Sequence, residues 1–235
     1  MSQVRQKHMT TGKKLLVRIE QRFRGRERKI LDQHLYVRSA VLLPLVEFED
    51  ELGVLFEVRA HHLKRQPGEI CFPGGRVDEN DANEEAAAVR ETCEELGLSP
   101  GQVQVYGPLD VLVGAFPMMI TPFVGTIPYE AIVPNPDEVA QVFVVPLSVL
   151  YQMQPKRFDV PVKALPDEDF PFHLIPGGRD YKWRTYTLPE YFYCYEDKVI
   201  WGLTARILRH FLELTRPEAM HWLSTDGGEE LPQKR

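Results

Sequence analysis

The chain lacks the features that mark secreted, membrane-spanning and zinc-binding proteins. Its 235 residues include only three cysteines, Cys71, Cys93 and Cys194, with no Cys-x-x-Cys pair. This excludes a disulfide framework and a zinc site, and predicts small buried thiols in a reducing compartment. No apolar run approaches the length of a membrane span, and the basic N-terminus has no apolar signal core. We therefore expect no secretion signal and no membrane contact, with the cytoplasm as the default location.

Excess positive charge and repetitive sequence are also missing. A formal net charge of -6 argues against a generic nucleic-acid binder. We find no internal repeat and no low-complexity tract, and the 43% hydrophobic and 26% charged residues are typical of a globular protein. The length suits one large domain with extensions. We predict an N-terminal helical extension over residues 1–35, a main domain over 36–215 and a C-terminal tail over 216–235.

Strand-like segments surround one conspicuous helix in the middle of the chain. Residues 49–53 are typical of a hairpin turn between two β-rich runs. Residues 155–184 look irregular, whereas 199–214 are apolar with helical character. This arrangement predicts an α/β sandwich, in which a mixed sheet lies between helices. The predicted β-rich runs cover residues 39–48, 53–59, 103–127, 139–145 and 191–195.

The central helix has recognisable start and stop signals. Asp81 is a good N-cap, Glu84 completes a capping-box pattern, and Gly97 ends the helix. The apolar stripe predicts which residues face the core, and it leaves the acidic residues of the last turns outside. The predicted buried residues are Ala82, Ala86, Val89, Cys93 and Leu96.

Three acids on this helix carry the strongest chemical signal. Glu91, Glu94 and Glu95 are spaced to share one face, where like charges repel unless a cation compensates. They follow a glycine turn at residues 72–75, whose backbone N–H groups can approach a phosphate closely. Mg²⁺ and Mn²⁺ take oxygen ligands, often a few carboxylates plus substrate phosphates. The pattern predicts a metal platform that hydrolyses a phosphoanhydride. It is not a P-loop, because no Gly-Lys-Ser/Thr follows the glycines.

Residues 75–98 resemble the Nudix box. Asp81 stands where the box has a glutamate, one residue too far from Arg90, and Thr92 replaces an aliphatic residue. The resemblance implies a Nudix fold, an α/β/α sandwich with a mixed β-sheet, over residues 36–215. It also implies a pyrophosphohydrolase that uses Mg²⁺ or Mn²⁺. The matching residues are Gly75, Arg90, Glu91, Glu94, Glu95, Gly97 and Leu98.

The preceding segment resembles the signature of Nudix hydrolases that act on coenzyme A. Residues 55–60 read Leu-Phe-Glu-Val-Arg-Ala and residues 72–75 read Phe-Pro-Gly-Gly. Phe56, Glu57 and Lys64 replace the leucine, threonine and second arginine of that signature. The resemblance implies cleavage of coenzyme A or acyl-CoA into 3′,5′-ADP and 4′-phosphopantetheine. Two alternatives stay open: a pyrophosphatase for ADP-ribose or a dinucleotide, and a non-catalytic nucleotide-sensing module.

The resemblance also implies roles for individual acids. Glu91 and Glu95 would be the main metal ligands, and Glu94 a ligand or the base that activates water. Arg90 would orient Glu94 or a neighbouring loop. Glu138 would be a second acid brought from a later loop to the metal or the attacking water.

The expected substrate contacts come from the basic loop and the glycine turn. Arg59 and Lys64 would meet phosphates, and Gly74 and Gly75 would line the phosphate side. Glu69, beside the turn, is an alternative metal neighbour. The implied partner is a small nucleotide diphosphate, with no nucleic acid and no membrane, and homodimerisation stays open.

Overall fold

The computed structural model describes residues 10–114 and 116–216 of the chain, and the predicted tail lies outside them except for Arg216. The chain divides into two units, Met1–Tyr36 and Val37–Arg235. In the first unit, the expected N-terminal helix is present as α1, Thr11–Phe23. The Thr10 hydroxyl accepts the N–H of Lys13 and so caps this helix. A 3₁₀ turn, η2, follows at Gln33–Leu35.

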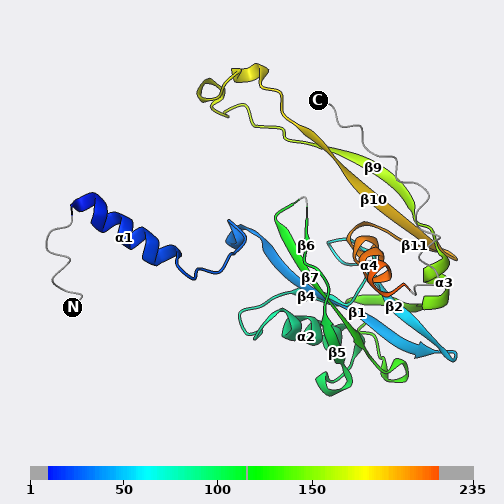
Figure 1. Ribbon diagram of the computed structural model, residues 1–235. Coiled ribbons are helices and arrows are strands. Elements are labelled where there is room, and N and C mark those ends of the chain that lie inside the picture. The colour runs from blue at the N-terminus through cyan, green and yellow to red at the C-terminus, as the bar shows by residue number, and fades with distance from the viewer. Residues whose placement is uncertain (1–9, 115, 217–235) are drawn as a thin grey trace, which may run out of the picture. The chain divides into compact units, whose positions relative to one another are not determined.

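The second unit is centred on a mixed eight-stranded sheet (Figure 1). The main strand order is β3-β2-β1-β7-β5, and β4, β6 and β8 pair with β1, β7 and β2 respectively. Strands β1 and β7 run parallel, and every other pair in this sheet is antiparallel. The strands are β1 Val37–Phe48, β2 Glu51–Arg59, β3 Ile70–Cys71, β4 Gly74–Arg76, β5 Gln104–Pro108, β6 Leu112–Val113, β7 Met118–Thr126 and β8 Val139–Pro146.

The predicted hairpin between the first two strands is confirmed. Glu49 and Asp50 form its tip, and both have a positive φ, of 50° and 61°. Two left-handed residues give the turn a twist that matches the flanking strands. The turn therefore sets the register of β1 on β2, in which Phe48 faces Glu51.

The helices of this unit are short. In the part of the chain that the structure describes, none is long and apolar enough to cross a lipid bilayer. The α-helices are α2 Glu84–Leu96, α3 Leu147–Gln152 and α4 Gly202–Thr215, and the 3₁₀ turns are η3 Pro100–Gln102, η4 Tyr129–Ala131, η5 Phe172–Leu174 and η6 Gly178–Asp180.

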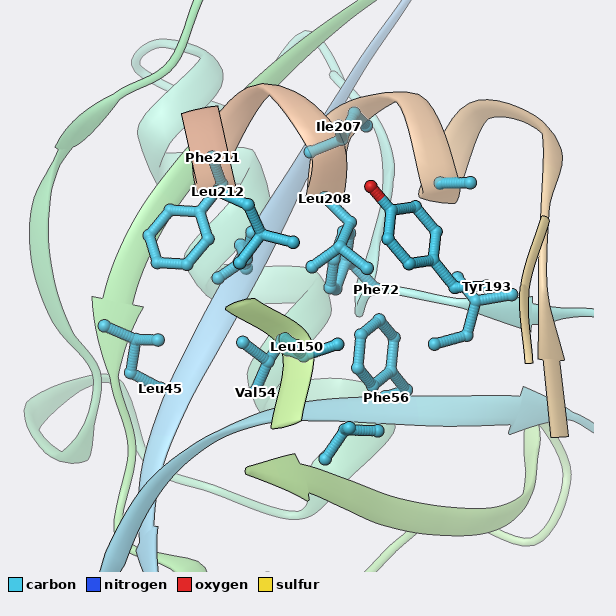
Figure 2. Packing of buried hydrophobic residues seen from close by; sticks show 14 of the residues in the cluster. Leu45, Val54, Phe56, Phe72, Leu150, Tyr193, Ile207, Leu208, Phe211 and Leu212 are labelled. Carbon is cyan, nitrogen blue, oxygen red and sulfur yellow. The ribbon is translucent and has the colours of Figure 1, made fainter. Parts of the chain in front are cut away.

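Alternating side chains of β1 and β2 divide the core into two clusters. Leu42 of β1 and Leu55 of β2 pack in the cluster that contains α2. Leu43 and Phe56 pack in the cluster that contains α3 and α4, part of which Figure 2 shows. Because successive residues of a strand point to opposite faces, α2 and α4 cover opposite sides of the sheet. The predicted α/β class with a mixed sheet between helices is confirmed.

A second, three-stranded sheet corrects one prediction. It consists of β9 Lys156–Lys163, β10 Thr185–Tyr195 and β11 Lys198–Ile200, in the order β11-β10-β9. The prediction that residues 155–184 are irregular is therefore wrong for β9. Phe158, Val160 and Val162 alternate with less apolar residues, but Pro161 interrupts the run and argues against a strand.

The N-cap and the buried face of the central helix, α2, both differ from the prediction. Its N-cap is Asn83, whose Oδ1 accepts the N–H of Ala86 at 2.9 Å, and not Asp81. Gly97 ends it, as expected. The buried face also differs, since it includes a threonine and a glutamate. Its residues are Ala87, Ala88, Thr92, Glu95 and Leu96.

The three cysteines are free thiols. Cys71 and Cys93 are half-buried, in rough agreement with the prediction of small buried side chains. Cys194 is exposed, so the prediction is wrong for this residue. It lies on β10, where its side chain faces away from the buried Tyr193 next to it.

Candidate active site

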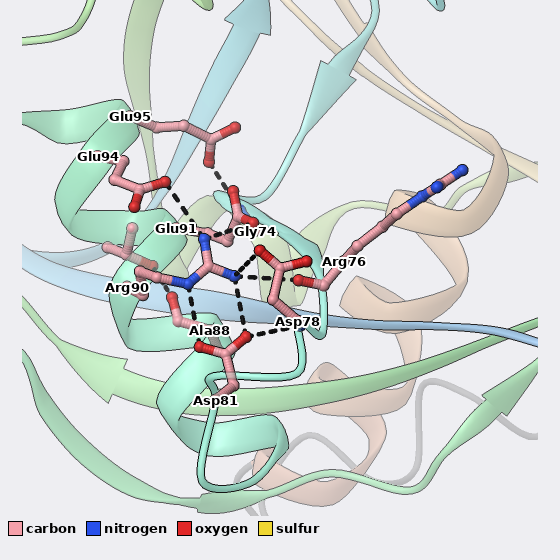
Figure 3. A network of polar contacts seen from close by, with 10 residues as sticks. Gly74, Arg76, Asp78, Asp81, Ala88, Arg90, Glu91, Glu94 and Glu95 are labelled. Atoms are coloured by element: carbon pink, nitrogen blue, oxygen red, sulfur yellow. Dashed lines mark hydrogen bonds and ion pairs between the residues drawn. The ribbon is translucent and has the colours of Figure 1, made fainter.

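The glycine turn and the last turns of α2 meet beside β1. Strand β4 pairs with β1, and α2 packs on both. The backbone N–H of Gly74 donates to Glu95 Oε2 at 2.8 Å (Figure 3). At Gly75 the Glu91 carboxylate occupies the place that a Cβ would need. The turn therefore needs glycine at Gly75 so that an acid can lie against its backbone.

Arg90 is the centre of a polar network beside this turn (Figure 3). Its Nε and Nη2 donate to the two carboxylate oxygens of Asp81, each at 3.0 Å. Its Nη1 donates to Glu91 at 2.9 Å and to Glu94 at 3.3 Å. Nη2 also donates to the carbonyl oxygen of Arg76 at 3.1 Å. A guanidinium presents its donors in a fixed fork, so Arg90 ties the loop after β4 to the acidic helix face.

The role of Asp81 is thus corrected from helix cap to anchor of Arg90. Hydrogen bonds from the Arg90 guanidinium hold the pKa of Asp81 below its ordinary value. In turn, the Asp81 carboxylate, followed by Glu91, raises the pKa of Arg90. The charged Asp81 carboxylate is a strong hydrogen-bond acceptor, and its bonds to Arg90 do not depend on Glu91 or Glu94.

Two acids of the site are almost completely buried. Glu95 is 3% exposed and Glu57, on the neighbouring β2, is 1% exposed. Burial raises the pKa of both carboxyls, and for Glu95 the nearby Glu57 charge adds to the effect. Burial also raises the pKa of Glu91, although Arg90 opposes this. Burial therefore makes the charged form of these carboxyls costly in the absence of a bound cation.

Glu138 reaches these acids from the loop before β8. The carbonyl oxygen of Glu138 accepts the N–H of Ala60 at 2.8 Å, next to the end of β2. In the same loop, the N–H of Asn135 donates to the carbonyl oxygen of Glu95 at 2.8 Å. Backbone bonds thus tie this loop to both α2 and β2. The charge of Glu138 contributes to the raised pKa values of Glu57, Glu91 and Glu95, which indicates that the four acids form one cluster.

The donor set of this cluster fits a hard divalent cation. Among residues 10–114 and 116–216, no three His, Cys, Asp or Glu side chains are arranged as ready metal ligands. Glu91 and Glu94 turn their oxygens toward Arg90, and Glu95 turns one toward Gly74. Yet the second oxygen of Glu57 is buried without a hydrogen-bond partner. Crowded carboxylates and an orphaned oxygen match the preference of Mg²⁺ and Mn²⁺ for oxygen ligands.

A cavity of about 440 Å³ adjoins the glycine turn. Arg59, Gly74 and Gly75 lie in its wall, as does Glu69. Lys64 is exposed on the loop between β2 and β3 and is not among the lining residues. The cavity wall as a whole is mostly apolar, and the cavity volume suits a small molecule. The apolar lining includes Phe116, Met118, Leu188, Trp201, Leu203 and Ile207.

Two residues of this region are missed by sequence reasoning. Glu57 carries a signal, because a single charge stands within the apolar run of β2. Trp201 carries no sequence signal of a cavity position, since its apolar neighbours suggest a core residue. Its ring stacks on Phe192 with centroids 6.0 Å apart, and it lines the cavity while 42% exposed.

Comparison with known proteins links the chain to one family. The profile of the NUDIX domain matches residues 36–166. Mouse peroxisomal coenzyme A diphosphatase NUDT7 is 43% identical over 124 residues, 50% of this chain and 52% of the relative, so the match spans about half of that protein. The uncharacterized Nudix hydrolase NudL of Enterobacter sp. (strain 638) is 34% identical over 177 residues, 73% of this chain and 79% of the relative. A MutT/nudix family protein from Enterococcus faecalis, of known structure, is 15% identical with a TM-score of 0.46, over 88% of this chain and 70% of that one.

Proposed function

Because the chain belongs to the NUDIX family of hydrolases and has its α/β fold, we propose that it cleaves the diphosphate of coenzyme A or acyl-CoA. A water oxygen bonds to one phosphorus while the bond from that phosphorus to the bridging oxygen breaks. The products are 3′,5′-ADP and 4′-phosphopantetheine or its acyl form. The observation that carries this proposal is the acid cluster beside the glycine turn, directly adjoining a largely apolar cavity.

The proposed activity depends on Mg²⁺ or Mn²⁺ held by Glu91 and Glu95, with Glu94 and Glu138 as further ligand or base. Such an ion neutralises phosphate charge and lowers the pKa of a water molecule bound to it. The two hydrogen bonds to Asp81 hold Arg90 independently of Glu91 and Glu94, which would leave those two acids available to hold the ion. It is in this sense a positioning residue, and it holds the loop after β4 against α2.

The substrate contacts are proposed from the cavity wall. Arg59 shares that wall with Gly74 and Gly75, so its guanidinium is placed to meet phosphate oxygens near the turn. Lys64 is proposed as an outer phosphate contact from the exposed loop. The apolar wall would receive the pantetheine arm or an acyl chain, because apolar groups gain most from leaving water there.

The name of the mouse relative supports coenzyme A over other diphosphates. Two of the three departures from the coenzyme A signature do not weigh against it. Phe56 is buried in the core and packs on Phe72 and Phe143, and Glu57 is buried with the acids. Neither side chain lies in the cavity wall. The alternative substrates, ADP-ribose or a dinucleotide, therefore rest on Lys64 alone.

A substrate panel tests the proposal. Full-length protein is incubated with Mg²⁺ or Mn²⁺ and with coenzyme A, an acyl-CoA, ADP-ribose or a dinucleotide, and products are identified by mass spectrometry. We expect the highest kcat/KM for a coenzyme A substrate and a loss of about a thousandfold for Glu95→Gln. Preference for ADP-ribose or a dinucleotide would overturn the substrate. Tight nucleotide binding without turnover would identify a sensing module instead.

Two further predictions concern the protein's surroundings. A cytoplasmic location stays a prediction, and the name of the mouse relative places that protein in peroxisomes. Fractionation of cells that express the tagged chain distinguishes the two. A homodimer likewise stays a prediction, which sedimentation of the purified protein tests.

A further inference from the structure

Glu57 is the acid of the cluster that no motif accounts for. It lies on β2, opposite Cys71 of β3 in the strand register. Its neighbour at i−2, Leu55, packs with α2, so the alternation of the strand directs Glu57 to the same face. That face carries Glu91 and Glu95. The charge of Glu91 contributes to the raised pKa of Glu57, and the charge of Glu57 contributes to the raised pKa of Glu95.

The carboxylate of Glu57 is held by one oxygen only. The Cys71 thiol donates to Glu57 Oε1 at 3.1 Å. The other oxygen, Oε2, is buried and has no partner. The side chain is 1% exposed, so solvent does not readily supply the missing hydrogen bond. A buried acceptor left unsatisfied destabilises the fold, so its retention calls for a ligand.

Among residues 10–114 and 116–216, no lysine or arginine pairs with this oxygen. In the described residues, neither Glu57 nor Glu95 forms an ion pair with a lysine or arginine; Arg90 pairs instead with Asp81, Glu91 and Glu94. Arg59 is near enough to favour the charged form of Glu57, but it makes no hydrogen bond to it. Two buried carboxylates of like charge, without a paired cation, repel each other strongly.

We propose that Glu57 is a further carboxylate ligand of the divalent cation, supplied by strand β2 in addition to the acids of α2. The Cys71 thiol holds one oxygen in place and leaves the other free for the ion. The inference rests on the proposed metal-dependent activity and extends its site across the sheet. Glu57 departs from the coenzyme A signature, and under this proposal that departure adds one oxygen ligand to the metal site.

Metal binding tests the inference without reference to turnover. Mn²⁺ is titrated into full-length protein that has been freed of metal by a chelator, and free Mn²⁺ is measured by electron paramagnetic resonance. We expect Glu57→Gln to raise the Mn²⁺ dissociation constant about tenfold or more, since affinity follows the number of charged ligands. Glu47→Gln, the same charge change at an exposed position of β1, is the matched control and should stay within about twofold of wild type.

Thermal unfolding of the same samples separates a ligand from a purely structural residue. Without metal, Glu57→Gln should melt at or above the wild-type temperature, because a carboxyl group whose charged form is costly to bury is gone. With Mn²⁺, its gain in melting temperature should be smaller than that of wild type. A lower melting temperature in both conditions, with an unchanged Mn²⁺ dissociation constant, would overturn the inference.

The outcomes distinguish the inference from the proposed function. If wild type binds Mn²⁺ and Glu95→Gln weakens it, but Glu57→Gln does not, only the role of Glu57 falls. If wild type binds no Mn²⁺, the proposed metal site falls with it. Should Glu57→Gln fail to fold, Glu57→Thr takes its place, because threonine suits a strand, and the same loss of affinity is expected.

Discussion

Helices α2 and α4 lie on opposite faces of one sheet and bury different kinds of side chain. Helix α4 buries Ile207, Leu208, Phe211 and Leu212 among the apolar residues of β1 and β2 (Figure 2). Helix α2 buries Glu95 and Thr92 together with small alanines. The first helix stabilises the fold by removing apolar surface from water. The second lies against the same sheet but places charge where it is costly, beside a glycine turn.

The α4 face of the sheet therefore mainly supports the fold, whereas the α2 face carries the acids. Changes in buried α4 residues that lie outside the cavity wall, such as Phe211, should alter stability and leave the chemistry of the folded protein unchanged. Changes in the acids of α2 should lower activity with little loss of stability, and some of them should stabilise the metal-free protein.

The largest expected effect concerns α4. Phe211→Ala should lower the free energy of unfolding by about 3–5 kcal/mol, because it leaves a cavity in the apolar cluster. Urea denaturation measures this. Leu214→Ala, at an exposed position of the same helix, is the control and should change the value by less than about 0.5 kcal/mol. If Phe211→Ala lowers the free energy of unfolding by less than about 1 kcal/mol, packing of α4 is not a main source of stability.

On α2, Arg90→Lys should lower kcat/KM about a hundredfold, equivalent to roughly 2.7 kcal/mol. A lysine keeps the charge but cannot bridge Asp81, Glu91 and the Arg76 carbonyl at once. Steady-state kinetics on the folded variant measures the loss. Arg38→Lys is the control, because Arg38 also pairs with an α2 acid, Glu84, but at the exposed first turn. Equal losses in the two variants would contradict a special role for Arg90.

The buried acids give the metal-free protein an unusual dependence on pH. The raised pKa values, about 7 for Glu57 and about 9 for Glu95 against an ordinary 4.5, mean that the folded state holds protons which the unfolded state releases. Their contribution to stability is complete below about pH 4.5 and is lost as the pH rises through 7 and then 9. Because each unit of raised pKa corresponds to about 1.4 kcal/mol, we expect a loss of several kcal/mol over this window.

Unfolding free energies measured across this pH range in a chelator test that expectation. The difference between wild type and Glu95→Gln isolates the acids from other titrating groups. It should grow with pH in favour of the variant, and added Mg²⁺ should reverse it. A difference that does not change with pH would refute the coupling between burial and charge.

The smallest expected effect is that of Thr92→Val. The Thr92 hydroxyl donates to the Ala88 carbonyl at 2.7 Å, but that carbonyl also accepts the regular helix hydrogen bond. Its loss leaves no orphaned group, so the free energy of unfolding should change by less than about 1 kcal/mol. Kinetic constants should stay within about twofold of wild type. A larger kinetic change would extend the chemical face of α2 beyond its acids.

The same comparison explains how much could be predicted from sequence. The spacing of Glu91, Glu94 and Glu95 after a glycine turn is local, so the acidic face could be recognised without a structure. The central strands β1 and β2 could be recognised as well, since they contain near-continuous runs of apolar residues. Strand β9 is exposed on both faces, and Pro161 within its short alternating run argues against a strand.

The burial of Glu95 and the position of Glu57 could not be predicted, for a physical reason. A helical wheel assigns apolar residues to the core, whereas α2 is turned so that Glu95 accepts the Gly74 N–H. Glu57 joins the cluster through the pairing of β2 with β3 and the face it shares with α2. Such relations depend on strand register and helix rotation, and apolar periodicity within one segment does not encode them.

The parallel pairing of β1 with β7 joins Ala40 to Thr121, far apart along the chain. A long loop must close before such contacts can form and stabilise the fold. The entropy lost on closing the loop slows folding. The acids at positions 57, 91, 95 and 138 come from segments that this sheet brings together. A truncated chain that ends before β7 would therefore carry Glu57, Glu91 and Glu95 without Glu138 and without the complete sheet, and cation binding should appear late during refolding.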